Sequence, residues 1–127
     1  HTPLLPSTRG MIGEKELKKM KKTAYLINMA RGALIDTSAL IKALKDGEIA
    51  GAGLDTLAAE TTVFGQANGA EKDVPADYKE LAAMPNVVIT PHVAFFTQTA
   101  ARNMVQIASN DAITIANGGR SRNEIRY

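Results

Sequence analysis

Three short runs of mostly apolar residues lie along the chain, and polar or turn-forming residues bound each of them. Continuous apolar runs of this length are typical of strands that are buried on both faces in a parallel sheet. The expected strands cover residues 23–30, 49–57 and 86–90. The second run, "IAGAGLDTL", contains several small residues, which favour a close approach by a neighbouring group.

Segments with apolar residues at helical spacing stand between and after these strands. The clearest covers residues 36–48, where Asp36 or Thr37 can cap the first turn and Gly47 can end the helix. The apolar face of this helix consists of Leu40, Ile41 and Leu44. Further helices are expected within 7–20, near 78–83 and at 97–116.

The alternation of strands and helices predicts an α/β domain with parallel strands and flanking helices. Three strands are about half of a doubly wound sheet, so we expect a partial doubly wound (Rossmann-like) domain. The polar stretch 58–85 exceeds the usual loop length, which indicates a functional loop or an insertion. The sequence starts with His1 and reads like the middle of a protein, so we expect a fragment of a longer chain.

Composition narrows the classes of function. The net charge of +2 is too small to argue for nucleic acid as a partner. No apolar stretch approaches the roughly 20 residues of a membrane span, so no membrane partner is expected. The sequence has no cysteine, which fits a reducing compartment such as the cytoplasm, and it shows no cluster of metal-ligating residues.

Polar residues lie at the end of each expected strand or just beyond it, and ligands of open α/β sheets bind at the carboxyl ends of the strands. They are Asn28, Arg31, Gly32 and Asp36 at the end of the first strand, Asp55 and Glu60 at the end of the second, and Thr90, Pro91 and His92 at the end of the third. Each residue alone has an ordinary structural explanation, such as a cap, a turn or a solvated charge. Their convergence on one edge favours a functional site.

The residue types at this edge indicate a definite chemistry. His92 is the only histidine apart from the first residue, and an unperturbed histidine exchanges a proton near neutral pH. A neighbouring carboxylate would orient it, with Glu60 the preferred candidate and Asp55 the competitor. The guanidinium of Arg31 matches a carboxylate in two-point contact. Together they predict a small substrate that carries a carboxylate and exchanges a proton on oxygen.

Other chemistries lack their motifs. No G-x-S-x-G turn exists, which argues against a serine hydrolase. The "GAGLD" segment is not a G-x-G-x-x-G dinucleotide fingerprint, and no other glycine-rich phosphate loop is present.

Three stretches resemble the C-terminal section of the D-2-hydroxyacid dehydrogenases. Within this family the chain most resembles the bacterial D-lactate dehydrogenase branch. They are "HTPLLPSTRGMIG", "LINMARGALIDTSALIKALKDGEIAGAGLDTLAAE" and "PNVVITPHVAFFTQTA". The resemblance implies NAD as cofactor and a small 2-oxo or 2-hydroxy acid, such as pyruvate, as substrate. It also implies a cytoplasmic enzyme that is a homodimer when intact.

The resemblance assigns roles to individual residues. Arg31 would hold the substrate carboxylate, Glu60 would pair with His92, and His92 would protonate the carbonyl oxygen during reduction. It thereby favours Glu60 over Asp55 as the partner of His92. The positions that would line the cofactor site are His1, Thr2, Pro3, Thr8, Met29, Ala30, Arg31 and Asp55.

The resemblance also implies a domain plan. Residues 1–117 would form the C-terminal half of an NAD-binding domain, and residues 118–127 a tail leading toward a catalytic domain. Because the glycine loop for the pyrophosphate is absent, we expect the chain alone to bind NAD weakly or not at all and not to turn over substrate. A D-2-hydroxyisocaproate-type dehydrogenase and a non-catalytic dinucleotide-binding module are the alternatives.

Overall fold

The computed structural model describes residues 1–58, 60 and 74–125. The chain divides into two compact units, His1–Val93 and Ala94–Tyr127, which we describe separately. The predicted domain boundary at residue 117 refers to a longer enzyme and stays a prediction.

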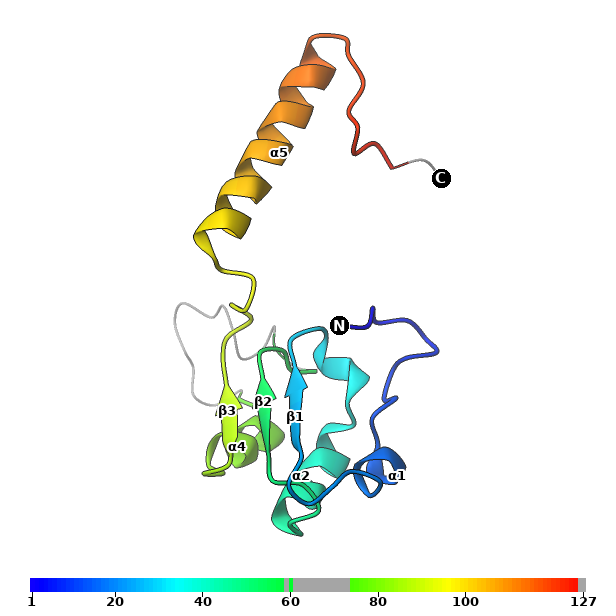
Figure 1. Ribbon diagram of the computed structural model, residues 1–127, viewed down its shortest axis with the longest axis vertical. Helices are drawn as coiled ribbons and strands as arrows, with labels where there is room; N and C mark the ends of the chain where they lie inside the picture. Colours follow the sequence, from blue (N-terminus) through cyan, green and yellow to red (C-terminus); the bar gives the residue numbers. More distant parts are fainter. Residues whose placement is uncertain (59, 61–73, 126–127) are drawn as a thin grey trace. The chain divides into compact units, whose positions relative to one another are not determined.

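A parallel sheet forms the centre of the first unit, as the sequence predicts (Figure 1). Its strands are β1 (Tyr25–Asn28), β2 (Gly51–Leu54) and β3 (Val87–Ile89), in the order β1-β2-β3. Each strand is shorter than its apolar run, because the ends of the runs turn into the loops that carry the polar residues.

The helices of this unit follow the predicted order. They are α1 (Glu14–Leu17), the 3-10 turn η1 (Gly32–Leu34), α2 (Thr37–Lys45) and α4 (Ala76–Ala82). Asp36 caps α2 by accepting a hydrogen bond from Ala39 N at 3.0 Å, and Gly47 follows its end with a φ of +65°. The helix expected within 7–20 covers only four residues, because Ile12 instead pairs with Ile35 in an isolated parallel bridge.

The hydrophobic core lies on one face of the sheet. Leu17 of α1, Leu40 of α2 and Leu81 of α4 are each at most 1% exposed and pack with side chains from the strands. On the sheet, Leu26, Leu54 and Val87 point into this core.

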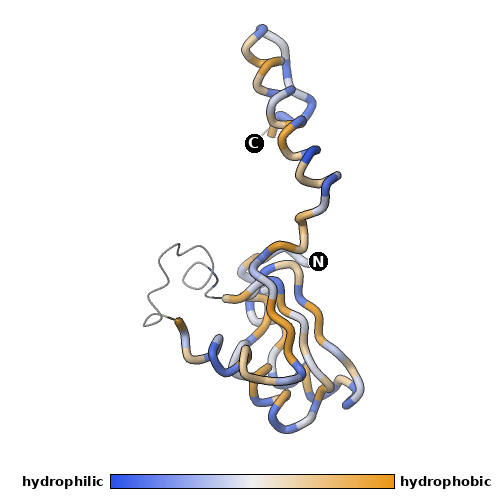
Figure 2. The backbone as a smooth tube through the Cα atoms, turned by 90° about the vertical axis from the view of Figure 1, so that its left-hand side faces the viewer, coloured by the Kyte–Doolittle hydropathy of each residue, from blue (hydrophilic) through white to orange (hydrophobic). Residues whose placement is uncertain are grey.

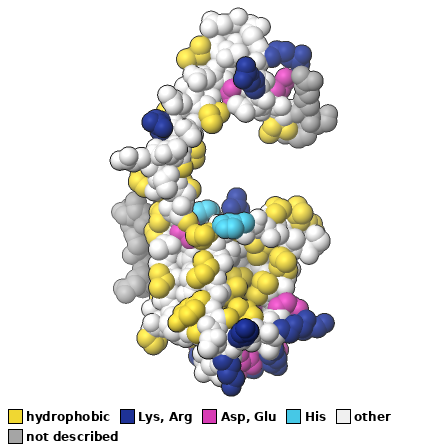
Figure 3. Space-filling view, in the orientation of Figure 1, with side chains coloured by type: hydrophobic (Ala, Val, Ile, Leu, Met, Phe, Trp, Pro, Cys, Tyr) yellow, Lys and Arg dark blue, Asp and Glu magenta, His cyan; other side chains and the backbone are white. Residues whose placement is uncertain are grey.

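The opposite face of the sheet corrects the expectation of strands buried on both faces. Tyr25, Ile27 and Val88 alternate with the core-facing residues, and they are 68%, 60% and 65% exposed. Figure 3 shows hydrophobic side chains gathered over the strands. The physical reason is that α1, α2 and α4 all pack on the other side.

The second unit contains α5 (Gln98–Ala116), whose start at the Thr97 cap agrees with the predicted range. Hydrophobic and hydrophilic residues mix along it, and none of its side chains is buried (Figure 2). Asp111 accepts hydrogen bonds from Asn123 Nδ2 at 2.9 Å and Ser121 Oγ at 2.8 Å, and these bonds hold the pKa of Asp111 below its usual value. Within the described residues, no helix is long and apolar enough to cross a membrane.

Candidate active site

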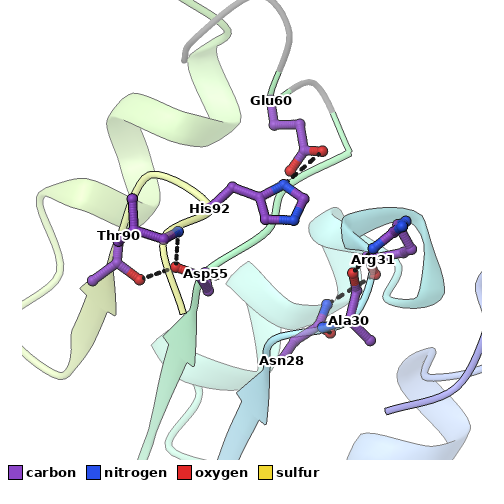
Figure 4. Close-up of polar contacts among 8 residues, drawn as sticks. Asn28, Ala30, Arg31, Asp55, Glu60, Thr90 and His92 are labelled. Atoms are coloured by element: carbon purple, nitrogen blue, oxygen red, sulfur yellow. Dashed lines mark hydrogen bonds and ion pairs between the residues drawn. The ribbon is translucent and has the colours of Figure 1, made fainter. Parts of the chain in front are cut away.

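The loops after the three parallel strands meet at one edge of the sheet. Arg31 follows β1, Asp55 directly follows β2, and His92 follows β3, while Glu60 comes from the segment beyond Asp55 (Figure 4). The predicted convergence is therefore present, and its cause is the parallel register, which aligns all three carboxyl ends.

His92 and Glu60 form the polar contact at this edge. The Nδ1 atom of His92 lies 3.3 Å from Oε1 of Glu60, and the two side chains are 39% and 26% exposed. The second carboxylate oxygen of Glu60, Oε2, is buried and has no recorded partner among the described residues. Because Nδ1 faces the carboxylate, Nε2 is the ring nitrogen through which His92 can exchange a proton with a ligand.

Asp55 binds the loop after β3, whereas the sequence analysis considered it as the competitor of Glu60 for the His92 ring. It is 4% exposed, and its Oδ1 accepts hydrogen bonds from Thr90 Oγ1 at 2.5 Å and from Val93 N at 2.9 Å. These bonds tie the carboxylate to the loop after β3, while Glu60 takes the contact with the His92 ring. A place for Asp55 beside the cofactor stays a prediction.

The backbone of His92 is strained. Its φ is +53°, in the left-handed region that non-glycine residues avoid at a cost of about 1–2 kcal/mol. The N–H of His92 is shared between the main-chain oxygens of Asp55, at 2.9 Å, and Thr90, at 3.0 Å. Strain of this kind is typical of functional sites, where surrounding contacts hold it in place.

Asn28 positions the turn that carries Arg31. This buried side chain accepts a hydrogen bond from Ala30 N and donates one to Arg31 O, both at 3.0 Å. The sequence analysis listed Asn28 at the end of the first strand but gave it no role. The available signal was a polar residue at the end of an apolar strand. Arg31 Nη1 donates to Ala30 O at 2.7 Å, and within the described part of the chain Arg31 forms no ion pair. Its guanidinium can therefore bind an anionic ligand.

An open hollow of about 590 Å³ lies beside Arg31. Its lining residues are His1, Thr2, Pro3, Leu4, Ala30 and Arg31. Five of these are predicted cofactor positions, which the structure thus brings together. Thr8 does not line the hollow, and its hydroxyl accepts a hydrogen bond from Leu5 N and donates one to Pro3 O, both at 2.8 Å. A place for Thr8 in the cofactor site stays a prediction. Met29 is 46% exposed and does not line the hollow.

The hollow agrees with part of a dinucleotide site. Its walls combine backbone and side-chain polar groups with one cation, a set that fits a polar anionic ligand such as NAD. The sequence carries no G-x-G-x-x-G turn, so the usual cradle for the pyrophosphate is not part of this chain.

Comparison with known proteins shows the family of the chain. Residues 1–94 match the family described as D-isomer specific 2-hydroxyacid dehydrogenase, NAD binding domain. A curated D-lactate/D-glycerate dehydrogenase of Pediococcus acidilactici is 40% identical over the whole chain. The chain spans 38% of the length of that relative.

Solved structures show the same relationship. A D-isomer specific 2-hydroxyacid dehydrogenase from Lactobacillus delbrueckii ssp. bulgaricus, in its NAD-complexed form, is 66% identical with a TM-score of 0.94 over 98% of this chain. D-lactate dehydrogenase with NAD+ from Lactobacillus jensenii is 54% identical with a TM-score of 0.93 over the whole chain. This chain covers 38% of each of these proteins. The family match covers most of the chain and the fold agrees with these solved structures, so the chain belongs to the NAD-binding domain family of the D-isomer specific 2-hydroxyacid dehydrogenases.

Proposed function

We propose that this chain supplies the proton-transfer site and part of the cofactor site of an NAD-dependent D-lactate dehydrogenase. The enzyme would interconvert a 2-oxo acid such as pyruvate and its D-2-hydroxy acid. The observation that carries the proposal is the contact of His92 Nδ1 with Glu60 Oε1 at 3.3 Å, at the strand edge that also bears Arg31. A non-catalytic dinucleotide-binding module has no need for this acid–base pair.

The roles of the three residues follow from their chemistry. Arg31 binds the carboxylate of the substrate and stabilises the negative charge that develops on its carbonyl oxygen. His92 delivers a proton from Nε2 to that oxygen during reduction and removes it during oxidation. Glu60 accepts a hydrogen bond from Nδ1, which orients the ring for proton transfer through Nε2.

The cofactor would lie beside these residues. His1, Thr2, Pro3, Ala30 and Arg31, which line the open hollow, would hold part of the dinucleotide. NAD, when bound, supplies or accepts the hydride at C2 of the substrate.

The setting of the enzyme is also part of the proposal. We propose a homodimeric protein of the cytoplasm, in which residues 1–117 belong to the cofactor domain and 118–127 lead to the catalytic domain. The absence of cysteine supports a reducing compartment, and the homodimer is proposed from the resemblance to the D-2-hydroxyacid dehydrogenases. Sedimentation of the protein over a range of concentrations would test the dimer.

A chimaera tests the proposed reaction directly. This chain replaces the matching 38% of the D-lactate dehydrogenase of Lactobacillus jensenii, and NADH oxidation is followed with pyruvate and with 2-oxoisocaproate. We expect activity with pyruvate, and preference for 2-oxoisocaproate would favour the hydroxyisocaproate-type alternative. A folded chimaera without 2-oxo acid reduction would contradict the proposal.

Variants of the chimaera test the individual roles. His92→Gln should lower kcat about 10²–10⁴-fold, as expected for loss of a general acid. Arg31→Lys should raise KM for the 2-oxo acid, because an ammonium cannot make the two-point contact. Lys22→Gln, at an exposed position, is the control and should leave both constants unchanged. Unchanged kcat in His92→Gln would exclude the proton-transfer role.

A further inference from the structure

The loop after β3 presents His92 in a conformation that does not persist without support. Its φ of +53° lies in the left-handed region, which is uncommon for residues with a side chain. A strained residue keeps such a conformation only where neighbouring contacts determine it. The contacts around His92 therefore decide where its ring points.

Asp55 holds the loop on both sides of His92. Its main-chain oxygen accepts the N–H of His92 at 2.9 Å. Its Oδ1 accepts the hydroxyl of Thr90, two residues before His92, and the N–H of Val93, one residue after it. Because Asp55 is 4% exposed, its carboxylate depends on such donors more than a solvated carboxylate would.

Thr90 is the side-chain donor in this arrangement. Its N–H donates to Leu54 O at 3.0 Å, which continues the sheet ladder and fixes its position beside Asp55. Pro91 restricts Thr90 to an extended backbone and offers no N–H of its own. The Thr90 hydroxyl, 2.5 Å from Asp55 Oδ1, thus ties the part of the loop that precedes His92 to Asp55. We call the hydrogen bonds of Asp55 Oδ1 with Thr90 and with Val93 N the latch.

We propose that Thr90 is a positioning residue, which acts through Asp55 to hold the His92 ring against Glu60. The proposal rests on the proposed function for its catalytic meaning, since a misplaced His92 would transfer its proton poorly. The latch itself is a property of this chain and is testable without any reaction. Figure 4 shows the contact of Thr90 with Asp55 and the contact of His92 with Glu60.

Nuclear magnetic resonance of the isotope-labelled chain gives two readouts. The ¹⁵N shifts of the His92 ring report its contact with Glu60, and only the ring of His1 shares that spectral region. Glu60→Gln supplies the reference for a ring without its carboxylate. The solvent-exchange rate of the Val93 amide reports the bond to Asp55 Oδ1.

Three variants separate the hydroxyl from its surroundings. Thr90→Val removes the donor at an exposed position, so the core stays intact, while Thr90→Ser keeps the donor. Thr114→Val is the matched control, because it removes a hydroxyl that donates to Asn110 O in α5. In Thr90→Val we expect the His92 ring shifts to move toward those of Glu60→Gln and the Val93 amide to exchange about tenfold faster or more.

The outcomes decide the proposal. Wild-type values in Thr90→Ser and Thr114→Val, together with the changes in Thr90→Val, would support it. Wild-type ring shifts and Val93 exchange in Thr90→Val would overturn it, as would equal changes in Thr90→Ser. An inactive but folded chimaera with an intact latch would instead count against the proposed function and leave the latch standing.

Discussion

Replacement of Gly32 by alanine tests how the turn at Arg31 is built. A Cβ atom added at Gly32 would lie 2.0 Å from the carbonyl carbon of Leu57 and 2.3 Å from the nitrogen of Ala58. Ordinary contact begins at about 3.4 Å, so the two backbone segments would have to separate by roughly 1.4 Å. The obstacle is backbone rather than the end of a flexible side chain, so a change of rotamer cannot relieve it.

This clash sets the expected loss of stability. Overpacking of a tight site costs about 1–3 kcal/mol, and the rigid neighbour places the loss in Gly32→Ala at about 3 kcal/mol. A domain of this size has a total stability of about 5–15 kcal/mol, so the loss is a large part of it. Urea unfolding followed by far-UV circular dichroism measures the free energy of unfolding of both proteins.

A second glycine supplies the control for this experiment. At Gly13 the nearest atom to an added Cβ lies 3.7 Å away, which is ordinary contact. We expect Gly13→Ala to change the free energy of unfolding by less than about 1 kcal/mol. If Gly32→Ala and Gly13→Ala unfold at the same urea concentration, the close approach of the Arg31 turn to Leu57 is not a feature of the folded protein.

Three further predictions concern the cap, the core and the C-terminal unit. Asp36→Ala should remove about 1 kcal/mol through loss of the α2 cap. The hydrogen bonds from Ser38 and then Ala39 lower the pKa of Asp36 in the folded protein. The stabilisation by this cap is therefore full above the usual aspartate pKa and disappears as the pH falls through the lower pKa of the folded protein. If the urea unfolding curves of the wild type and Asp36→Ala stay equally far apart at low pH, this linkage is refuted. Leu40→Ala, at a core position 1% exposed, should cost about 2–5 kcal/mol in urea unfolding, whereas Leu5→Ala, at 49%, should cost almost nothing. Asp111 accepts hydrogen bonds from the Ser121 and Asn123 side chains, and the Asn123 N–H donates to Ser121 Oγ. Asp111→Ala should therefore speed amide exchange at Asn123. Unchanged exchange would show that Asp111 does not hold this turn.

Local pattern and chain order were enough for several features of the protein. The face of Leu40, Ile41 and Leu44, with a capping residue before it and Gly47 after it, determines α2, because every interaction involved spans a few residues. The alternation of apolar runs and helices determines a parallel sheet, and parallel strands bring their carboxyl ends together. For the same reason the edge with Arg31, Glu60 and His92 could be predicted.

Only the tertiary structure decided how these residues are used. Residue chemistry preferred Glu60 with Asp55 as the competitor, and the family resemblance also favoured Glu60. The contacts that separate the two acids span more than thirty residues, since Glu60 reaches the His92 ring and Asp55 binds Thr90. The left-handed backbone of His92 has no local signal, because it results from hydrogen bonds to another strand end. The bare face of Tyr25 and Ile27 was also hidden, since an apolar run does not record on which side of a sheet the helices will pack.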